Sequence, residues 1–352
     1  MSARRRHAVV TEDLARISAA ALPWECLDGR VVLVTGANGL VASYLVEALL
    51  YRREIGAPGP ARVVALARNL ERASERFAAY EGRPDLAFVV QDASQPLRYD
   101  ERIDFVVHAA GQATPRHFGA DPVGTYMPNV LGTHHLLERA RRDGVASFVF
   151  VSSGAVHGAI PETAVLREDV YGVVDPLDLR ASYAESKRMG ETMCRSWHAQ
   201  FGVPARIVRL GHTYGPGMRR DDERAFAEFV FNVVDRRDIV LNSDGAAVRP
   251  YCYLADATEA ILRVLLVGTA GEAYLLANTA ASCSVRELAE LVASLYPERG
   301  VQVRAGSARI RPGYLPNRDP ARPVDTSKIA ALGWVPTTNL EDGFRRTIAS
   351  YL

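Results

Sequence analysis

A tyrosine and a lysine four residues apart give the chain its clearest chemical signal. They are Tyr183 and Lys187, in the stretch 180–188, which reads R-A-S-Y-A-E-S-K-R. In a helix, side chains four residues apart lie on the same face. A cation beside the phenol stabilises the phenolate and moves its pKa from about 10 toward neutrality, where it can exchange a proton with a substrate hydroxyl. The alternative is an ordinary solvated pair on a helix surface.

Lysine is scarce in this sequence, which contains only Lys187 and Lys328 among its 42 Lys and Arg residues. An arginine at position 187 would have a wider, planar guanidinium group and a permanent charge, so it could not replace the compact ammonium beside the phenol. The scarcity favours a specific role for Lys187.

A glycine turn in the first 50 residues has the form of a phosphate-binding site. The run 35–42, T-G-A-N-G-L-V-A, follows a β-branched run and precedes a helical pattern. Glycines 36 and 39 permit a tight turn and the close approach of a pyrophosphate, which would rest on amides at the helix N-terminus. We therefore assign Gly36, Asn38, Gly39 and Leu40 to a dinucleotide site; the alternative is a structural turn without a ligand.

Residues after the second and third predicted strands bear on the type of cofactor. Arg68 stands where NAD sites usually present a carboxylate to the ribose hydroxyls. It could instead meet a 2′-phosphate, stack on adenine or point into solvent, so NADP stays open beside NAD. Asp92 closes the third strand and is a candidate partner for the adenine amino group, or alternatively a cap for the next turn.

Short apolar runs alternate with helical patterns through the first 210 residues. Runs typical of buried strands lie at 31–34, 62–67, 86–90, 105–110, 147–152 and 205–210, and helical patterns lie at 40–50, 70–80 and 129–142. Such alternation predicts an α/β fold with a Rossmann-type doubly wound parallel sheet, covered on both faces. From about residue 211, turn residues and shorter periodic segments predict a smaller mixed α/β C-terminal region that binds substrate.

We divide the chain accordingly. Residues 1–28 form an N-terminal extension, and 29–210 form the dinucleotide-binding Rossmann domain, with a return segment at about 250–278. The substrate-binding C-terminal region then comprises 211–249 and 279–352.

Composition excludes several classes of partner. A formal net charge of +1 gives no electrostatic footprint for nucleic acid or an anionic membrane. The four cysteines show neither C-x-x-C nor metal spacing, so we expect reduced thiols and no metal site. No apolar run reaches the roughly 18 residues of a membrane span, and Glu12, Asp13 and Arg16 stand where a signal peptide would be apolar. We expect a cytoplasmic protein that does not bind membranes.

The glycine turn, the strand 148–153 ending in two serines, and the Tyr-x-x-x-Lys motif occur in one order along the chain. This order resembles the extended short-chain dehydrogenase/reductase family, the NAD-dependent epimerases, dehydratases and decarboxylases of nucleotide sugars. The resemblance runs from about residue 29 to the C-terminus. Segments 122–133, 180–194 and 213–229 are similar to UDP-glucuronate decarboxylases. The resemblance implies a bound nicotinamide dinucleotide, a nucleoside-diphosphate sugar as substrate, and a homodimer.

The family's roles transfer to matching positions of this sequence. Ser153 would hydrogen-bond the sugar hydroxyl, Tyr183 would remove its proton, and Lys187 would hold the nicotinamide ribose and lower the tyrosine pKa. Further positions implied for the cofactor are Ala93, Ala109 and Ala110. Positions considered for the substrate are Asn129, Arg180, His212, Arg224 and Arg249, of which Arg249 matches an arginine that contacts the diphosphate. A surface role for the arginines and backbone capping by Asn129 are the alternatives.

One position departs from the family's dehydratases and decarboxylases. They carry an acidic residue two places after the catalytic Ser/Thr, where this chain has Ala155. Alanine cannot move a proton, and small residues at this place resemble the 4-epimerases. Those enzymes need only the Ser/Tyr/Lys set, because the ketose rotates and takes the same hydride back on its other face.

Other side chains keep further reactions open. His157 and His212 replace residues usual in the family, and histidine titrates near pH 6.5, so an extra acid or base could allow epimerisation at C3 or C5. His117 and Cys252 are weaker candidates of the same kind. Structural packing is the alternative for all four.

The sequence therefore predicts a nucleotide-sugar epimerase, most simply acting at C4 of a UDP-sugar such as UDP-glucuronate through a 4-keto sugar. The alternatives are a decarboxylase or 4,6-dehydratase with another acid, a C3/C5 epimerase, a net NAD(P)-dependent oxidoreductase, and a dinucleotide-binding module without turnover.

Overall fold

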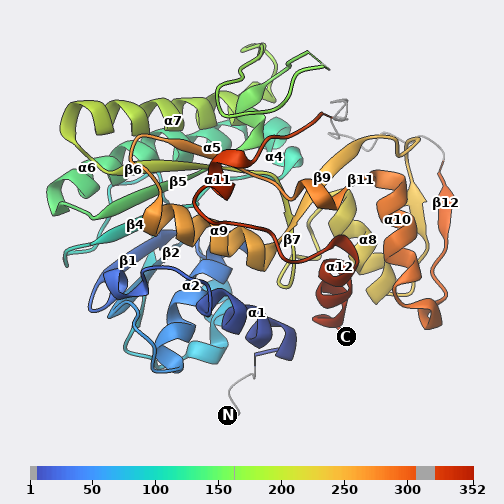
Figure 1. Cartoon of the computed structure of the whole chain (residues 1–352), viewed down its shortest axis with the longest axis horizontal. Helices are drawn as coiled ribbons and strands as arrows, with labels where there is room; N and C mark the ends of the chain where they lie inside the picture. Colours follow the sequence, from blue (N-terminus) through green and yellow to red (C-terminus); the bar gives the residue numbers. More distant parts are fainter. Residues whose placement is uncertain (1–5, 162, 307–321) are drawn as a thin grey trace.

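A seven-stranded parallel sheet forms the centre of the larger lobe (Figure 1). The computed structural model describes residues 6–161, 163–306 and 322–352. The strand order is β10-β6-β5-β4-β1-β2-β3, and every neighbouring pair is parallel. The strands are β1 (Val31–Thr35), β2 (Arg62–Ala67), β3 (Leu86–Val90), β4 (Phe105–His108), β5 (Ser147–Ser153), β6 (Ala205–Leu210) and β10 (Ala273–Leu276). The predicted Rossmann-type fold is confirmed.

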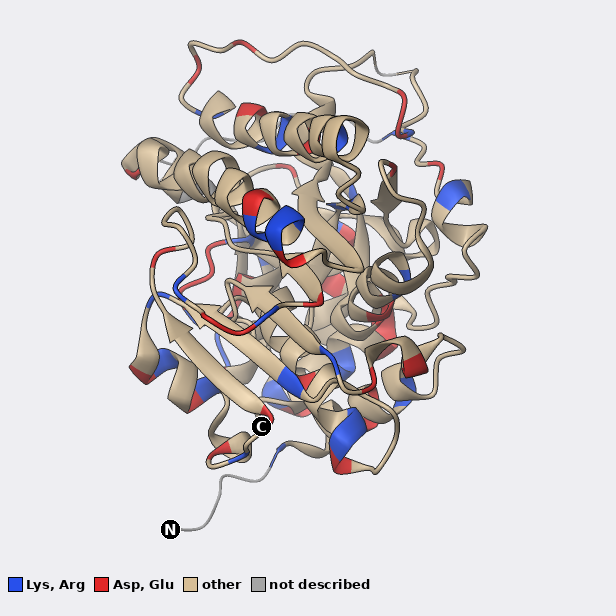
Figure 2. Ribbon diagram, turned by 90° about the vertical axis from the view of Figure 1, so that its left-hand side faces the viewer, with Lys and Arg blue, Asp and Glu red and all other residues tan. Residues whose placement is uncertain are grey.

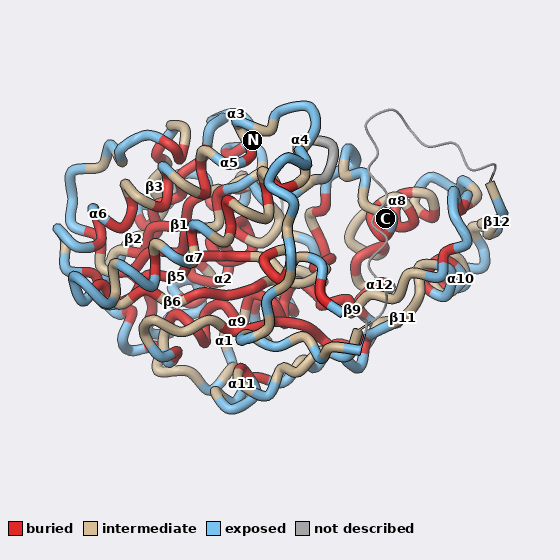
Figure 3. Tube along the Cα trace, turned by 90° about the horizontal axis from the view of Figure 1, so that it is seen from above, coloured by how far each residue is buried: buried red, intermediate tan, exposed pale blue. Residues whose placement is uncertain are grey.

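Helices cover both faces of this sheet, which explains why its strands are apolar on both sides. One face carries α5 (Pro122–Met127), a π-helix (Pro128–Gly132), α6 (Thr133–Asp143) and α7 (Ala181–Phe201). The other carries α1 (Ala8–Ser18), α2 (Leu40–Glu54) and α9 (Leu254–Val267), while α3 (Leu70–Arg76) packs on β3 at the edge. Figure 3 shows the resulting buried centre between exposed outer helices.

A smaller lobe is built from the segments after β6. It contains a three-stranded sheet of β11 (Ser282–Ser284), β9 (Val248–Tyr253) and β7 (His212–Tyr214), and a pair formed by β12 (Val303–Ala305) and β8 (Ile239–Leu241). Around these lie α8 (Ala225–Val234), α10 (Val285–Ser294) and α12 (Leu340–Ala349), with α11 (Ser327–Ala330) set against β10 of the larger sheet (Figure 1). Part of the proposed C-terminal region, 307–321, lies outside the described residues.

Strand β10 and helix α8 are among the elements that were not predicted from the sequence. Strand β10 is only four residues long, and its apolar run cannot be distinguished by periodicity from a core helix segment. Helix α8 has only two polar residues, Glu228 and Asn232, so its sequence is mainly a short apolar run. Both owe their conformation to tertiary packing.

Charges of both signs are interspersed over the surface helices (Figure 2), as the formal net charge of +1 implies. Within the described ranges, no helix combines the length and apolarity that a membrane span requires.

A buried carboxylate joins the N-terminal helix to the rest of the molecule. Asp13, on α1, is 1% exposed and accepts hydrogen bonds from the hydroxyls of Tyr44 at 2.8 Å and Tyr253 at 2.6 Å. Arg346, on α12, donates to its other oxygen at 2.8 Å. Burial raises the pKa of Asp13, and the three donors oppose this rise. One side chain therefore connects α1, α2, β9 and α12.

Replacing Asp13 by Ala should lower the free energy of unfolding by roughly 3 kcal/mol, because Arg346 and two buried hydroxyls lose their acceptor. Glu12→Ala is the matched control, since the exposed Glu12 pairs with the same Arg346 at 3.0 Å. We expect the control to cost less than about 1 kcal/mol. Urea unfolding measures both, and equal effects would contradict a special role for Asp13.

Candidate active site

Helix α7 lies against β5, and this contact positions the candidate catalytic residues. The buried residues of α7 recur at helical spacing and are Ala181, Tyr183, Ser186, Lys187, Gly190 and Cys194. At Gly190, a Cβ would collide with the ring of Phe150 on β5. The glycine thus allows the backbone of the helix to approach the strand closely, and it brings Tyr183 and Lys187 over the carboxyl end of β5.

Lys187 is held by the strand that it covers. Its Nζ donates a hydrogen bond to the carbonyl of Val151 at 2.7 Å and lies 4.7 Å from the ring centroid of Phe150. The side chain is only 4% exposed. Burial lowers the pKa of Lys187 to about 7, while the nearby carboxylate of Glu191 opposes the change. Burial therefore disfavours the charged form of this lysine.

Tyr183 lies beside Ser153, as the resemblance implies. A hydrogen bond to the Ser153 side chain and the charge of Arg224 lower the pKa of Tyr183, but burial outweighs them and the net pKa is raised. The ring stacks on Phe118 with centroids 4.8 Å apart and an angle of 14° between the planes. The structure therefore brings Ser153, Tyr183 and Lys187 together at one strand end.

The expected effect of Lys187 on the tyrosine is not seen in the protein alone. The lysine ammonium is 6.0 Å from the centroid of the Tyr183 ring, and the tyrosine pKa is raised rather than lowered. The reason is desolvation, which disfavours both the phenolate and the ammonium.

Ala155 supports Ser153 only through its backbone. Its amide donates to the Ser153 Oγ at 3.2 Å, which also caps the short helix Gly154–His157. The methyl group at this position supplies no acid or base.

A buried ion pair behind the lysine was not recognised in the sequence. Arg209 on β6 makes bidentate contacts to Glu191 at 2.8 and 3.0 Å, and it is 1% exposed. Ser152 donates to Glu191 at 2.6 Å. Glu191 follows Lys187 by four residues, so helical spacing was the signal that could have placed it on the same face. Through Ser152, this carboxylate fixes the strand end that carries Ser153.

The glycine turn lies at the carboxyl ends of β1 and β4. Gly36 has a φ of +70°, and a Cβ there would lie 2.7 Å from the Cα of Ala110 and 2.9 Å from the carbonyl oxygen of Ala109. Gly39 is the N-cap of α2, with Leu40 as its first residue. These positions form a narrow cradle at the start of a helix, where backbone amides face outward.

A buried hydrogen-bond chain supports this cradle. His108 Nε2 lies 3.1 Å from the Pro128 carbonyl, so it must donate, and Nδ1 then accepts from the Thr35 hydroxyl at 2.7 Å. Thr35 Oγ1 in turn accepts from the Ala110 amide at 3.1 Å. Burial lowers the pKa of His108 to about 3, which keeps this tautomer neutral.

Two asparagines have buried side-chain oxygens without a hydrogen-bond partner among the described residues. Asn38 donates its amide to the Asn69 carbonyl at 3.1 Å, which leaves Oδ1 unsatisfied. Asn129 donates to the Thr125 carbonyl and to Ser186, and its Oδ1 lies against Gly111, as does Lys187 Nζ. Buried acceptors of this kind are normally satisfied, so both indicate a polar ligand.

Arg68 and Asp92 meet at the ends of β2 and β3. Arg68 Nη1 is 3.9 Å from Asp92 Oδ2, and both side chains are substantially exposed. Asp92 also accepts from the Ser94 amide at 2.8 Å, as the capping alternative predicted. Ala93 is buried, and its carbonyl packs against Gly132 of the π-helix.

Basic side chains gather near Tyr183 on the side of the smaller lobe. Burial, followed by the charges of Arg249 and Arg224, lowers the pKa of His212 to about 4. His212 lies against the Tyr251 ring with centroids 5.9 Å apart. Arg224 is paired with Asp222 at 2.5 Å, while Arg249 lies on β9 beside Cys283 on β11. Arg180 is the N-cap residue of α7, so it stands at the same end of that helix as Tyr183.

The remaining candidates, His157, Cys252 and His117, have contacts typical of structural residues. His157 Nδ1 donates to the Val170 carbonyl at 2.8 Å, and the charged groups that act on it are Arg209, Glu191 and Arg188. Burial raises the pKa of the Cys252 thiol well above its usual value, so it stays protonated. His117 accepts a hydrogen bond from Thr125 through its carbonyl.

Comparison with known proteins agrees with this geometry. Residues 32–277 match the model of the NAD dependent epimerase/dehydratase family, which is well over half of the chain. The chain belongs to that family, and the resemblance found in the sequence is confirmed.

Individual proteins that resemble the chain have low sequence identity to it. UDP-glucuronic acid decarboxylase 6 of Arabidopsis thaliana is 28% identical over 89% of this chain and 86% of its own length. The dTDP-glucose 4,6-dehydratase DesIV of Streptomyces venezuelae, solved with NAD and TYD, has 28% identity and a TM-score of 0.75, covering 91% of this chain and 96% of its own. A UDP-glucuronic acid 4-epimerase of Bacillus cereus shares the fold at 22% identity and a TM-score of 0.74, covering 91% and 98%. The fold therefore accommodates more than one reaction.

The low pKa of Lys187 predicts a pH dependence of stability. Its pKa is about 7 in the folded chain, against an ordinary lysine value of 10.5, so between these two pH values the unfolded chain binds more protons. Stability therefore rises with pH in this window. The unfolding free energy of the wild type should rise by roughly 2 kcal/mol relative to that of Lys187→Met from about pH 7 to about pH 9. Urea unfolding at both pH values measures it, and a constant difference would contradict a depressed lysine pKa.

Proposed function

We propose that the protein is a nucleotide-sugar epimerase that inverts C4 of a UDP-sugar, such as UDP-glucuronate, with NAD as its bound cofactor. The observation that carries this proposal is the convergence of Ser153, Tyr183 and Lys187 at the end of β5, with Ala155 beside them. The set suffices to oxidise and reduce a sugar hydroxyl, and no carboxylate stands at position 155.

The residues of the cradle fit NAD. Gly36 lets the turn pack directly against the backbone of Ala109 and Ala110 at the end of β4, and the amides at the start of α2 suit a pyrophosphate. The unsatisfied oxygens of Asn38 and Asn129 supply acceptors for polar groups of the cofactor. When bound, NAD would accept a hydride from the sugar carbon and return it.

Arg68 keeps NADP open, because a guanidinium at this place could meet a 2′-phosphate. Its partner Asp92 lies 3.9 Å away and offsets part of the positive charge that a 2′-phosphate would need. The same carboxylate can accept from a ribose hydroxyl or from the adenine amino group. We therefore propose NAD and keep NADP as the alternative that would suit a net oxidoreductase.

The protein residues divide the proton transfer. Tyr183 takes the proton from the sugar hydroxyl, and Ser153 orients that hydroxyl through its own hydrogen bond. Lys187 holds the neighbouring ribose and, when protonated, stabilises the phenolate. The raised pKa of Tyr183 means that this base has to be activated in the ternary complex, where the ligands complete its surroundings.

Arginines of the smaller lobe would hold the diphosphate. Arg249 and Arg224 both act electrostatically on His212, so their charges converge on one region near Tyr183. Guanidinium groups suit bidentate contacts to phosphate. Neutral His212 can donate to a sugar or phosphate oxygen, and Arg180 at the start of α7 is a further candidate.

A decarboxylase or 4,6-dehydratase is the second candidate, favoured by the Arabidopsis relative at 28% identity. Either reaction needs an acid or base that Ala155 cannot provide. For a C3/C5 epimerase, His157 is the weaker acid or base, because its Nδ1 donates to the Val170 carbonyl, and His212 is the stronger candidate. The intact Ser/Tyr/Lys set also disfavours a binding module without turnover.

The cysteine chemistry accords with the proposed cytoplasmic location, since all four cysteines are free thiols. We also propose a homodimer, which the family resemblance implies.

Product analysis tests the reaction. The purified protein should convert one member of a panel of UDP-, dTDP-, GDP- and CDP-sugars into a product of unchanged mass with altered proton couplings at C4. Tyr183→Phe should bind cofactor yet lose about two to four orders of magnitude in turnover, because the proton acceptor is gone. Mass spectrometry and proton NMR measure both. Loss of carbon dioxide or water from the sugar would contradict the epimerase, and full turnover by Tyr183→Phe would contradict the assigned base.

Arg249→Ala should weaken binding of the nucleotide sugar by about tenfold or more, since a charge-assisted phosphate contact is lost. The unfolding midpoint should change little. Arg286→Ala is the matched control, because Arg286 is an exposed arginine of the same lobe that bonds to the Asp244 carbonyl. Calorimetric titration with UDP-glucuronate compares them. Unchanged affinity in Arg249→Ala would exclude Arg249 from the diphosphate site.

A further inference from the structure

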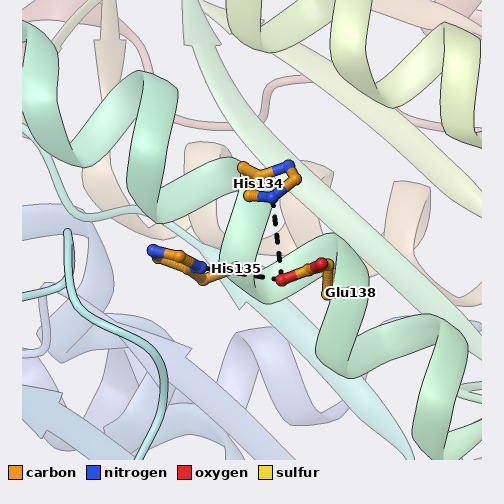
Figure 4. Close-up of side chains that lie close together, drawn as sticks. All are labelled: His134, His135 and Glu138. Atoms are coloured by element: carbon orange, nitrogen blue, oxygen red, sulfur yellow. Dashed lines mark ion pairs between the residues drawn. The ribbon is translucent and has the colours of Figure 1, made fainter.

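Three side chains with metal-ligating atoms converge on the first turns of α6, outside the candidate active site (Figure 4). His134 and Glu138 are four residues apart, and His135 and Glu138 are three apart, so all three share one side of the helix. Their ligand atoms lie within 4.8 Å of one another. The sequence analysis considered only cysteine spacing and expected no metal; the signal that it missed is H-H-x-x-E at 134–138.

The geometry is close to coordination but too open for direct hydrogen bonds. His134 Nε2 and His135 Nδ1 each lie 3.7 Å from the same carboxylate oxygen of Glu138. At this distance neither imidazole forms a hydrogen bond with the carboxylate. Tetrahedral Zn²⁺, with bonds of about 2.0 to 2.2 Å, needs ligand atoms about 3.3 Å apart. The separations in the cluster extend to 4.8 Å, so the partly exposed side chains would have to rotate toward the ion.

We propose that His134, His135 and Glu138 form a site for one divalent transition-metal ion per chain, best suited to Zn²⁺. Two imidazoles and one carboxylate match the donors that zinc accepts, whereas Mg²⁺ and Ca²⁺ prefer oxygen ligands alone. Three protein ligands leave one tetrahedral position for water.

The surroundings orient one imidazole and limit the repulsion from nearby cations. The His134 ring contacts Trp197 edge to face, with centroids 5.9 Å apart. Arg141 and Arg142 lie near Glu138, but Arg141 is placed over the Phe201 ring at 4.0 Å and Arg142 is paired with Asp143 at 3.2 Å. Both guanidinium groups thus have partners other than Glu138, which leaves its carboxylate for the ion.

The site lies on α6, apart from the candidate active site, and would act on the helix itself. Helix α6 packs on β4 and α7 through residues such as Leu136, Leu137 and Ala140, while the three ligands are on its more exposed side. The ion would link residues one turn apart directly after the π-helix 128–132, which also carries Asn129. Bound metal should therefore stabilise the start of α6 and raise the unfolding temperature.

Metal titration of the full chain, after removal of any affinity tag, tests the site. Calorimetry with Zn²⁺ should give one ion per chain, and Co²⁺ should develop the stronger visible absorption of a four-coordinate ion. His134→Ala and Glu138→Gln should each weaken Zn²⁺ binding by about tenfold or more, since each removes one ligand bond. Glu290→Gln, an exposed glutamate of α10, is the matched control and should bind as wild type.

The rise in unfolding temperature with added Zn²⁺ should disappear in His134→Ala/His135→Ala and persist in Glu290→Gln. Circular dichroism shows whether each variant is folded. Wild-type affinity in folded His134→Ala and Glu138→Gln, or a six-coordinate Co²⁺ spectrum identical to that of the free ion, would overturn the proposal.

Discussion

The close approach of α7 to β5 is the constraint on which the candidate site depends. Gly190 removes the side chain that would collide with Phe150, so the helix lies close enough for Lys187 to reach the Val151 carbonyl at 2.7 Å. Tyr183, one turn earlier, then lies beside Ser153. Interiors are close-packed, so a single methyl group at Gly190 would shift the whole face of the helix.

Burial determines the pKa values of Lys187 and Tyr183. Desolvation lowers the lysine pKa to about 7 and raises that of Tyr183, so neither group is charged without cost. The Glu191–Arg209 pair behind them is held by geometry that includes Ser152 and the Glu168 carbonyl. A buried pair with satisfied hydrogen bonds is rigid rather than strongly stabilising. Its value here is to fix the end of β5.

The distinction between epimerase and decarboxylase depends on much less of the structure. The chain matches its family from β1 to β10. Proteins with this fold include both a decarboxylase and a 4-epimerase. Ala155 lies two residues after Ser153, where its backbone amide is used and its methyl group is chemically inert. The proposal of an epimerase rather than a decarboxylase therefore depends mainly on Ala155.

The sequence by itself determined the parallel sheet, because buried strands such as β1 and β5 contain continuous apolar runs, at 31–34 and 148–151, that are bounded by turns. It also determined the glycine turn and the Tyr183–Lys187 pair, since both are local patterns with fixed spacing. Only the tertiary structure decided that the lysine is buried and that Glu191 pairs with Arg209 across two elements. It alone placed β10 in the sheet and left Asn38 and Asn129 with unsatisfied oxygens. Burial and contacts between distant segments depend on how helices and strands pack, and no local pattern encodes that.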